Sequence, residues 1–295
     1  MIENVSAEDI ERVIVLRDSF CKEDAYILQR TALEFRVMYG EKISNGQAFL
    51  RLLTENGNAT GYCLVELQGQ TGWIKEVYVD PLRRDVQAYL TLLQGAVAWC
   101  TESQALQVRY ICPERPLECT AAFCEFGFDL MREHVQMEMP LQEIFDQPPT
   151  LDLSSFKDFG PGDRLVDWVA HCTGNGGLYS ATDLEPFVLD EGDFSFVAFK
   201  DGEPVGFMIA EVNEQRNQQE RQRVLYIEQM AVAPGYRMRG LATQMLDLVF
   251  RKGLALGLLT ARLHVFHDNA AAYRLYEKLG FVEVKRINHW LLEVE

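Results

Sequence analysis

Apolar side chains recur every three to four positions in two stretches of the chain that lie 153 residues apart. The spacing i, i+3, i+4, i+7, i+8 predicts a helix with one buried face in each stretch. The positions are Tyr89, Leu92, Leu93, Ala96 and Val97 in the first stretch, and Ala242, Met245, Leu246, Val249 and Phe250 in the second. A short apolar run precedes each helix, WIKEVYV at 73–79 and VLYIEQMAV at 224–232, and favours a central β-strand.

The same shift of 153 residues relates further positions, so the chain contains one structural unit twice. Val79, Pro81, Arg84 and Gly127 correspond to Val232, Pro234, Arg237 and Gly280. Upstream, a polar turn separates two alternating apolar runs in residues 49–67 and again in 194–212, which is typical of a β-hairpin. Each unit is therefore predicted to run helix, hairpin, strand, helix, strand, helix, strand. We expect a mixed α/β sheet (α+β) in two tandem domains, 1–146 and 151–295, joined by the proline-containing segment 145–152.

The turn between strand and helix in the second copy combines a glycine with two arginines. It reads Arg237-Met-Arg-Gly240-Leu-Ala242. The first turn of a helix has unpaired N–H groups and a partial positive charge, so a diphosphate binds there if no side chain blocks it. Gly240 and Ala242 leave that approach open, and Arg237 and Arg239 would add charge-assisted contacts. We therefore predict an anion site at this turn.

This turn resembles the signature of the GNAT superfamily of N-acetyltransferases, in which Arg or Gln, x, x, Gly, x, Gly or Ala joins a strand to a helix. A second family pattern follows, with Asn269, a helix containing Tyr276, and the pair Gly280-Phe281 opening the next strand. Both motifs lie within residues 155–295, and the first half is covered only through its similarity to the second. The fold implied is a pair of tandem GNAT acyl-CoA N-acyltransferase-like domains.

The resemblance implies acetyl-CoA as co-substrate and assigns residues to it. The pyrophosphate would bind the amides of Arg237, Met238, Arg239, Gly240, Leu241, Ala242 and Thr243, and the pantetheine would pair with Met230, Ala231 and Val232. Asn269 would contact the cofactor arm. Tyr276 would protonate the departing thiolate, because a phenol keeps its proton at neutral pH yet can give it to sulfur.

The sequence motifs identify the residue that accepts the proton of the attacking amine less clearly. Glu228, on the strand next to the cofactor, is a candidate for accepting the proton directly or through water. Strand alternation predicts that Glu228 shares a face with Tyr226, Met230 and Val232. His264, on the next apolar strand, is a reserve candidate.

The first copy lacks each of these groups at the corresponding position. Gln87, Tyr89, Phe123 and Lys75 stand where the second copy has Gly240, Ala242, Tyr276 and Glu228. We therefore predict a degenerate first domain without acetyl transfer. It could shape the substrate pocket, brace the second domain or bind a regulator, and the residues leave these roles open.

Charge and cysteine usage narrow the class of partner. A net charge of −16 disfavours nucleic acid, which needs clustered Lys and Arg. Residues 236–286, in contrast, hold nine basic residues against four acidic ones, which suits a small polyanion. The seven cysteines lack CxxC spacing, so we expect reduced thiols and no metal. The first residues resemble neither a signal peptide nor a membrane span, so we expect a cytoplasmic protein without a membrane partner.

The sequence thus predicts an acetyl-CoA-dependent N-acetyltransferase acting on a primary amine of a small cationic molecule. The acidic residues in segment 183–196 favour a cationic acceptor such as a polyamine or aminosugar. The alternatives are acetylation of a protein amine, or a non-catalytic module that senses acyl-CoA. The presence of Tyr276 favours the enzyme, because a sensor needs no proton donor. A monomer is mildly preferred over a dimer.

Overall fold

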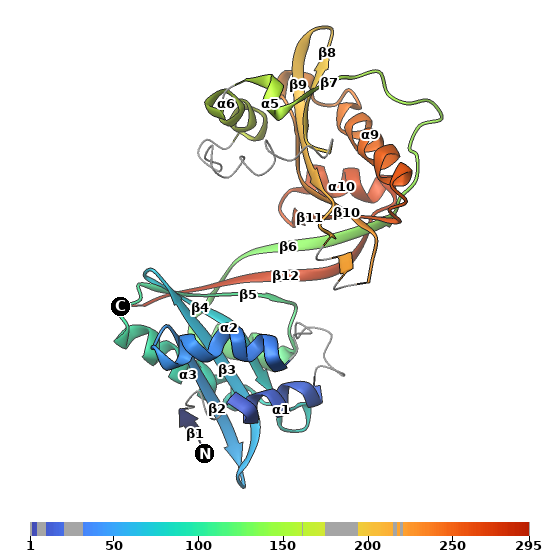
Figure 1. The fold of residues 1–295 in the computed structure, drawn as a ribbon. Helices are drawn as coiled ribbons and strands as arrows, with labels where there is room; N and C mark the ends of the chain where they lie inside the picture. The colour runs from blue at the N-terminus through green and yellow to red at the C-terminus, as the bar shows by residue number, and fades with distance from the viewer. Residues whose placement is uncertain are drawn as a thin grey trace. The chain divides into compact units, whose positions relative to one another are not determined.

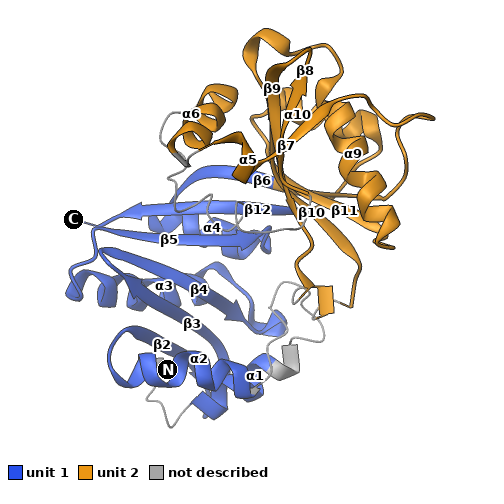
Figure 2. Ribbon diagram, turned by 45° about the horizontal axis from the view of Figure 1, so that its top comes forward, with its two compact units in different colours: residues 1–134, 285–295 blue, residues 135–284 orange. Residues whose placement is uncertain are grey.

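The computed structural model describes residues 2–4, 10–20, 32–160, 162–174, 194–214, 217–218 and 221–294. Its chain divides into two compact units, residues 1–134 with 285–295 and residues 135–284 (Figure 2). These are called unit 1 and unit 2 below. They differ from the predicted ranges 1–146 and 151–295, because the chain passes from one unit to the other inside two strands.

Each half of the chain supplies one run of the predicted elements (Figure 1). The first half contains β1 (Ile2–Asn4), α1 (Ile10–Phe20), α2 (Ala32–Ser44), β2 (Ala48–Glu55), β3 (Asn58–Gln68), β4 (Thr71–Val79), η2 (Pro81–Arg83), α3 (Val86–Glu102), β5 (Gln107–Pro113), α4 (Leu117–Phe126) and β6 (Asp129–Pro140). The second half contains β7 (Asp152–Ser155), α5 (Phe156–Phe159), α6 (Gly162–Thr173), β8 (Phe196–Lys200), β9 (Glu203–Glu211), β10 (Val224–Val232), η3 (Pro234–Tyr236), α9 (Leu241–Ala255), β11 (Thr260–Phe266), α10 (Ala270–Leu279) and β12 (Val282–Glu293).

The strand order confirms the predicted mixed sheet and both predicted hairpins. In unit 1 the strands follow the order β1-β2-β3-β4-β5-β12, and in unit 2 they follow β6-β11-β10-β9-β8-β7. The hairpins β2/β3 and β8/β9 are antiparallel, whereas β4/β5 and β10/β11 are parallel. Each parallel pair is connected through a helix, α3 or α9, as parallel strands require.

The last strand of each half completes the sheet of the other unit. Val135, Met137 and Met139 of β6 are buried in the core of unit 2, whereas Trp290 of β12 is buried in the core of unit 1. Residues 287–293 of β12 pair antiparallel with residues 107–113 of β5. The apolar pattern of a strand fixes which face is buried but not which sheet edge the strand joins, so the sequence did not reveal this exchange.

Helices cover both faces of the strands in unit 2. Helices α9 and α10 share one apolar core with Leu225 and Ile227 of β10, and α5 and α6 share another with Phe207 and Ala231. Figure 2 shows α6 and α9 on opposite sides of these strands. Unit 1 repeats the arrangement, with α3 and α4 on one face and α1 and α2 on the other.

Two further observations concern the described part of the chain. None of its helices is both long enough and apolar enough to cross a membrane. Its six cysteines are all free thiols, of which five are buried and Cys124 is exposed.

Candidate active site

A fork between two parallel strands forms the centre of the candidate site in unit 2. Strands β10 and β11 are paired from Val224 and Thr260 up to Ile227 and Leu263, and beyond that point both strands continue without pairing to each other. A β-bulge in β10 lies at the same place, where the pairing with β9 steps from Ile227 to Gln229 and skips Glu228. Glu228 is exposed at the mouth of the fork.

The bulge reverses which side chains of β10 face the core. Leu225 and Ile227 pack in the core shared with α9 and α10, and so do Met230 and Val232, although simple alternation would separate the two pairs. The prediction that Glu228 lies on one face with Tyr226, Met230 and Val232 is therefore wrong, because an extra residue in the strand shifts the alternation. Met230 and Val232 nevertheless lie on the open side of the fork, where the pantetheine was predicted.

The turn after β10 presents a bare helix N-terminus. Gly240 is the N-cap of α9 with φ +74°, and this N-cap residue provides no side-chain hydrogen bond to the first turn. A Cβ added at Gly240 would meet nothing within 4 Å, so the glycine serves the left-handed backbone and leaves open space above it. Met238 also has a positive φ, +60°, and its side chain is fully exposed. The predicted N–H groups from Leu241 to Thr243 open this helix, as an anion site requires.

The two arginines of the turn differ in what they contact. Arg237 donates from Nε to the carbonyl of Val232 at 3.0 Å and from Nη2 to the carbonyl of Cys172 at 2.9 Å. Its guanidinium thus ties the turn to the end of β10 and to α6. Arg239 lies over the ring of Tyr236, 5.6 Å from the centroid. Arg237 acts here as a support for the turn, a role that the motif alone did not indicate.

Of the remaining predicted residues, Tyr276 lies on α10 and Asn269 is the N-cap of that helix. Tyr276 is buried against Phe281 in the core of α9 and α10, with ring centroids 5.6 Å apart. Burial raises the pKa of Tyr276 to about 12, so its phenol stays protonated at neutral pH. Asn269 caps α10, since its Oδ1 accepts from the Ala272 N–H at 3.3 Å.

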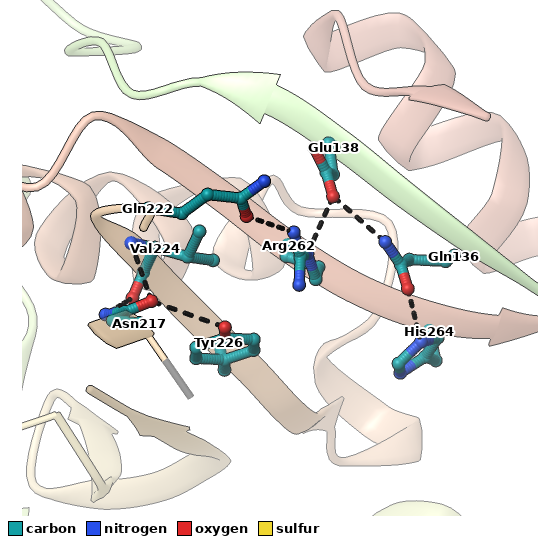
Figure 3. Close-up of polar contacts among 8 residues, drawn as sticks. All are labelled: Gln136, Glu138, Asn217, Gln222, Val224, Tyr226, Arg262 and His264. Carbon is teal, nitrogen blue, oxygen red and sulfur yellow. Dashed lines mark hydrogen bonds and ion pairs between the residues drawn. The ribbon is translucent and has the colours of Figure 1, made fainter. Parts of the chain in front are cut away.

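Polar side chains on β6 and β11 form a chain of contacts that the sequence did not predict (Figure 3). Arg262 Nε donates to Glu138 Oε1 at 2.6 Å, and Gln136 Nε2 donates to the same oxygen at 2.9 Å. Gln136 Oε1 lies 3.4 Å from His264 Nε2. Gln136 and Glu138 come from the exchanged strand, so no motif in the second half could have indicated them.

Unit 1 keeps the fork and the bulge, but a carboxylate of its own caps the first turn of the helix that follows. Strands β4 and β5 are paired up to Ile74 and Tyr110, and the bulge skips Lys75. Helix α3 begins at Val86, two residues earlier than α9 after the shift of 153, and its N-cap Asp85 accepts from the Ala88 N–H at 2.7 Å. An Asp directly before a helix is a capping signal, so this difference could have been found in the sequence.

Other side chains fill the rest of the unit 1 fork. Arg115, after β5, donates to the carbonyl of Val77 on β4 at 2.9 Å, beyond the point where the two strands part. Phe123, the counterpart of Tyr276, stacks on Tyr110 at 5.1 Å and contacts Trp290. Arg115 was also missed, although Asp268 stands at the corresponding position of unit 2.

The acidic residues predicted to attract a cationic acceptor, in segment 183–196, all lie outside the described residues, since the structure describes none of residues 175–193.

Known proteins resemble this chain in sequence and in fold. The sequence profile of the Acetyltransferase (GNAT) family matches residues 163–281. The chain is 34% identical over 168 residues to the mycothiol acetyltransferase of Streptomyces avermitilis, a match covering 52% of each protein. It is 31% identical over 118 residues to N-alpha-acetyltransferase 30 of Schizosaccharomyces pombe, covering 39% of this chain and 74% of that protein. The match thus spans about half the length of the mycothiol acetyltransferases.

Two solved structures share the fold over nearly the whole chain. A GCN5-related N-acetyltransferase from Sphaerobacter thermophilus superposes with a TM-score of 0.68 at 18% identity, over 99% of this chain and 95% of that one. A tandem GNAT protein from the clavulanic acid biosynthesis pathway gives 0.58 at 14% identity, over 99% and 98%. With the bulged fork, the bare helix N-terminus and the two motifs at their spacing, these matches show that the chain belongs to the GNAT acetyltransferase family, in its tandem form.

Proposed function

We propose that the protein is an acetyl-CoA-dependent N-acetyltransferase that acetylates a primary amine in unit 2. The observation that carries the proposal is the contrast between the two helix N-termini. Gly240 opens α9 with no capping side chain, whereas Asp85 fills the same place in α3. A helix N-terminus with free amides and open space suits a diphosphate.

The gap between β10 and β11 is proposed to hold the pantetheine arm of acetyl-CoA. In the proposal the pyrophosphate rests on the amides from Arg237 to Thr243, and the pantetheine pairs with the edge of β10 from Met230 to Val232. That edge has no β11 partner beyond Ile227. Asn269 contributes its side-chain amide, whose N–H groups remain available as donors while Oδ1 caps α10. No metal is assigned a role.

Two side chains are proposed to move protons. Tyr276 gives its proton to the departing thiolate, which fits the high pKa that burial produces. Glu228, exposed at the bulge, accepts a proton from the amine directly or through water. The acid lies in the core with α10, while the base lies at the open mouth of the fork.

The proposed acceptor is a small cationic molecule such as a polyamine or an aminosugar. The net charge of −16 favours such a molecule by long-range attraction and disfavours nucleic acid. A protein N-terminus or lysine is the second acceptor to test, since a relative is named an N-alpha-acetyltransferase. We further propose a cytoplasmic monomer.

A screen of acetyl-CoA consumption over an amine library, paired with calorimetric titration of coenzyme A, tests this proposal. We expect micromolar binding of coenzyme A and turnover with small amines before peptides. Binding without turnover on any amine would favour an acyl-CoA sensor instead, and a chain that does not bind coenzyme A would overturn both readings.

A further inference from the structure

The polar chain on β6 and β11 holds His264 in a defined orientation. At one end, the guanidinium of Arg262 is nearly buried, with its side chain 5% exposed, and donates to both Glu138 and Gln222. The carboxylate of Glu138 also accepts from Gln136 Nε2. At the other end, Gln136 Oε1 faces the exposed ring of His264, as Figure 3 shows.

The side-chain contacts from Arg262 through Glu138 and Gln136 determine the tautomer of His264. An ionised carboxylate only accepts hydrogen bonds, so the amide group that faces Glu138 must be the NH₂ of Gln136. The other end of the amide is then the carbonyl, which only accepts, so His264 Nε2 must carry a hydrogen and donate to it. In the neutral imidazole, the lone pair is therefore on Nδ1.

His264 lies at the mouth of the fork, next to the proposed reaction centre. Leu263 is the last residue of β11 that pairs with β10, and His264 follows it, as Glu228 follows Ile227 on the neighbouring strand. Ala261, Leu263 and Val265 face the core that contains Tyr276, so His264 faces the opposite side of the sheet. The acid and the imidazole thus stand on opposite faces of the fork.

Unit 1 lacks this arrangement although it retains part of the framework. Arg109 stands where unit 2 has Arg262, and it is paired in register with Leu291, the counterpart of Glu138. Ile111 stands at the position of His264 and is paired with His289, the counterpart of Gln136. Among the described residues, this series of contacts therefore belongs to unit 2, which also has Tyr276 and the bare N-terminus of α9.

We infer that His264, oriented by Gln136 and Glu138 of the exchanged strand, is a second proton acceptor for the amine beside Glu228. The inference rests on the proposed acetyl transfer and deepens it. An imidazole titrates near neutral pH, where an ordinary carboxyl group has little affinity for a proton. His264 therefore gives the ammonium a second route for losing its proton, beside the route through Glu228, at a pH where an imidazole can hold that proton.

The protons and bonds of the step balance. The ammonium loses one proton to Nδ1 of His264, which passes it to solvent. The amine nitrogen then bonds to the thioester carbonyl carbon, and the carbon–sulfur bond breaks. Tyr276 gives its proton to the thiolate and regains one, through water, from the nitrogen as the amide forms.

Chemical rescue and the pH profile test the role of His264 in the full-length protein. With the amine found in the screen, His264→Ala should lower kcat about 100-fold at pH 7, with the KM for acetyl-CoA unchanged. Added imidazole should restore part of kcat. The rise of kcat/KM near neutral pH should disappear in His264→Ala and persist in Glu228→Gln. The matched control is His267→Ala, which removes an exposed imidazole three residues away and should leave kcat unchanged.

A separate experiment, which needs no amine substrate, tests whether Gln136 positions the ring of His264. Nitrogen-15 NMR of the ring should show the Nε2–H tautomer of His264 in the wild type and a mixture of tautomers in Gln136→Leu. That variant should also lose about fivefold in kcat, the equivalent of one neutral hydrogen bond.

The outcomes separate the inference from the proposed function. Turnover of His264→Ala at the wild-type rate, or absence of rescue by imidazole, would overturn the proton-acceptor role and leave acetyl transfer standing. An Nδ1–H tautomer in the wild type would overturn the positioning. A fixed Nε2–H tautomer in a protein that acetylates no amine would overturn the proposed function and the acceptor role together.

Discussion

Asp85 and Met238 stand at corresponding positions before helices α3 and α9, and the two helix ends differ completely in what they offer a ligand. In unit 1 the carboxylate of Asp85 already occupies an N–H of the first turn. In unit 2 the chain turns through two residues with positive φ, Met238 and Gly240, and leaves the first turn uncapped. The N-terminus of α3 is capped by a side chain of the protein itself, whereas the N-terminus of α9 has no capping side chain from its N-cap residue and suits an anionic ligand.

The same contrast extends along the fork. Both units have the parallel pair that parts at the same point and a bulge at the same residue, Lys75 or Glu228. Unit 1 bridges its fork with Arg115 and packs Phe123 over Tyr110. The fork and the bulge therefore belong to the fold, and activity depends on whether side chains of the chain itself fill the space. We therefore propose that unit 1 does not transfer acetyl groups because its own side chains occupy this space, although it keeps the strands and the bulge of the fold.

The largest predicted effect concerns the boundary between the units. A fragment of residues 151–295 lacks β6 and with it Val135, Met137 and Met139, each worth about 1.5–3 kcal/mol of burial. Their sum is comparable with the whole stability of a typical domain. We expect this fragment to be unfolded by circular dichroism and amide NMR, and the fragment 135–284 to unfold cooperatively on heating. Equal folding of the two fragments would show that the exchanged strand is dispensable.

The second-largest effect is predicted for a substitution at the proposed diphosphate site. Gly240→Glu places a carboxylate where the diphosphate is proposed to bind and imposes a left-handed conformation that costs about 1–2 kcal/mol. Because a Cβ there meets nothing within 4 Å, the protein should stay folded. Calorimetry should show coenzyme A binding weakened at least ~100-fold. Gln87→Glu, at the matching position of unit 1, should leave binding unchanged, and a retained affinity in Gly240→Glu would remove the assignment.

Reciprocal substitutions of Tyr276 and its counterpart Phe123 test the proton donor. Tyr276→Phe should lower kcat about 100-fold without altering the dissociation constant of coenzyme A. Because burial raises the pKa of Tyr276 to about 12, the phenol keeps its proton below that pH. The wild-type enzyme should therefore not lose its acid up to pH 10. Phe123→Tyr should lower stability by roughly 1–3 kcal/mol, by burying a hydroxyl, and should add no activity. Unchanged turnover in Tyr276→Phe would exclude the acid role.

The smallest effect is expected for Asp85→Ala. Removal of the N-cap should lower the free energy of unfolding by about 1 kcal/mol, measured by urea denaturation. It should not create a second site for coenzyme A, because Arg115 and Phe123 still fill the fork. Stoichiometry by calorimetry checks this, and two bound molecules per chain would mean that a single carboxylate keeps unit 1 closed.

The sequence predicted the elements whose patterns are local. The hairpins, the helix stripes and the strand–turn–helix around Gly240 all follow from periodicity and turn chemistry over a few residues. The bulge at Glu228 was missed because simple alternation was carried through the polar pair Glu228-Gln229, where the core-facing positions in fact shift by one residue. Arg237 was assigned to the ligand, although its side chain reaches back to two carbonyls. Gln136 was missed because its place depends on which sheet a distant strand joins.

The exchange of β6 and β12 also sets an order for folding during synthesis. Unit 1 cannot close its sheet until residues 285–293 leave the ribosome, although the rest of that unit ends at residue 134. At about 5–20 residues per second, the open edge of β5 waits roughly 8–30 s for its partner. Throughout that interval the nascent chain exposes an unpaired strand edge in unit 1, to which another chain could pair and aggregate.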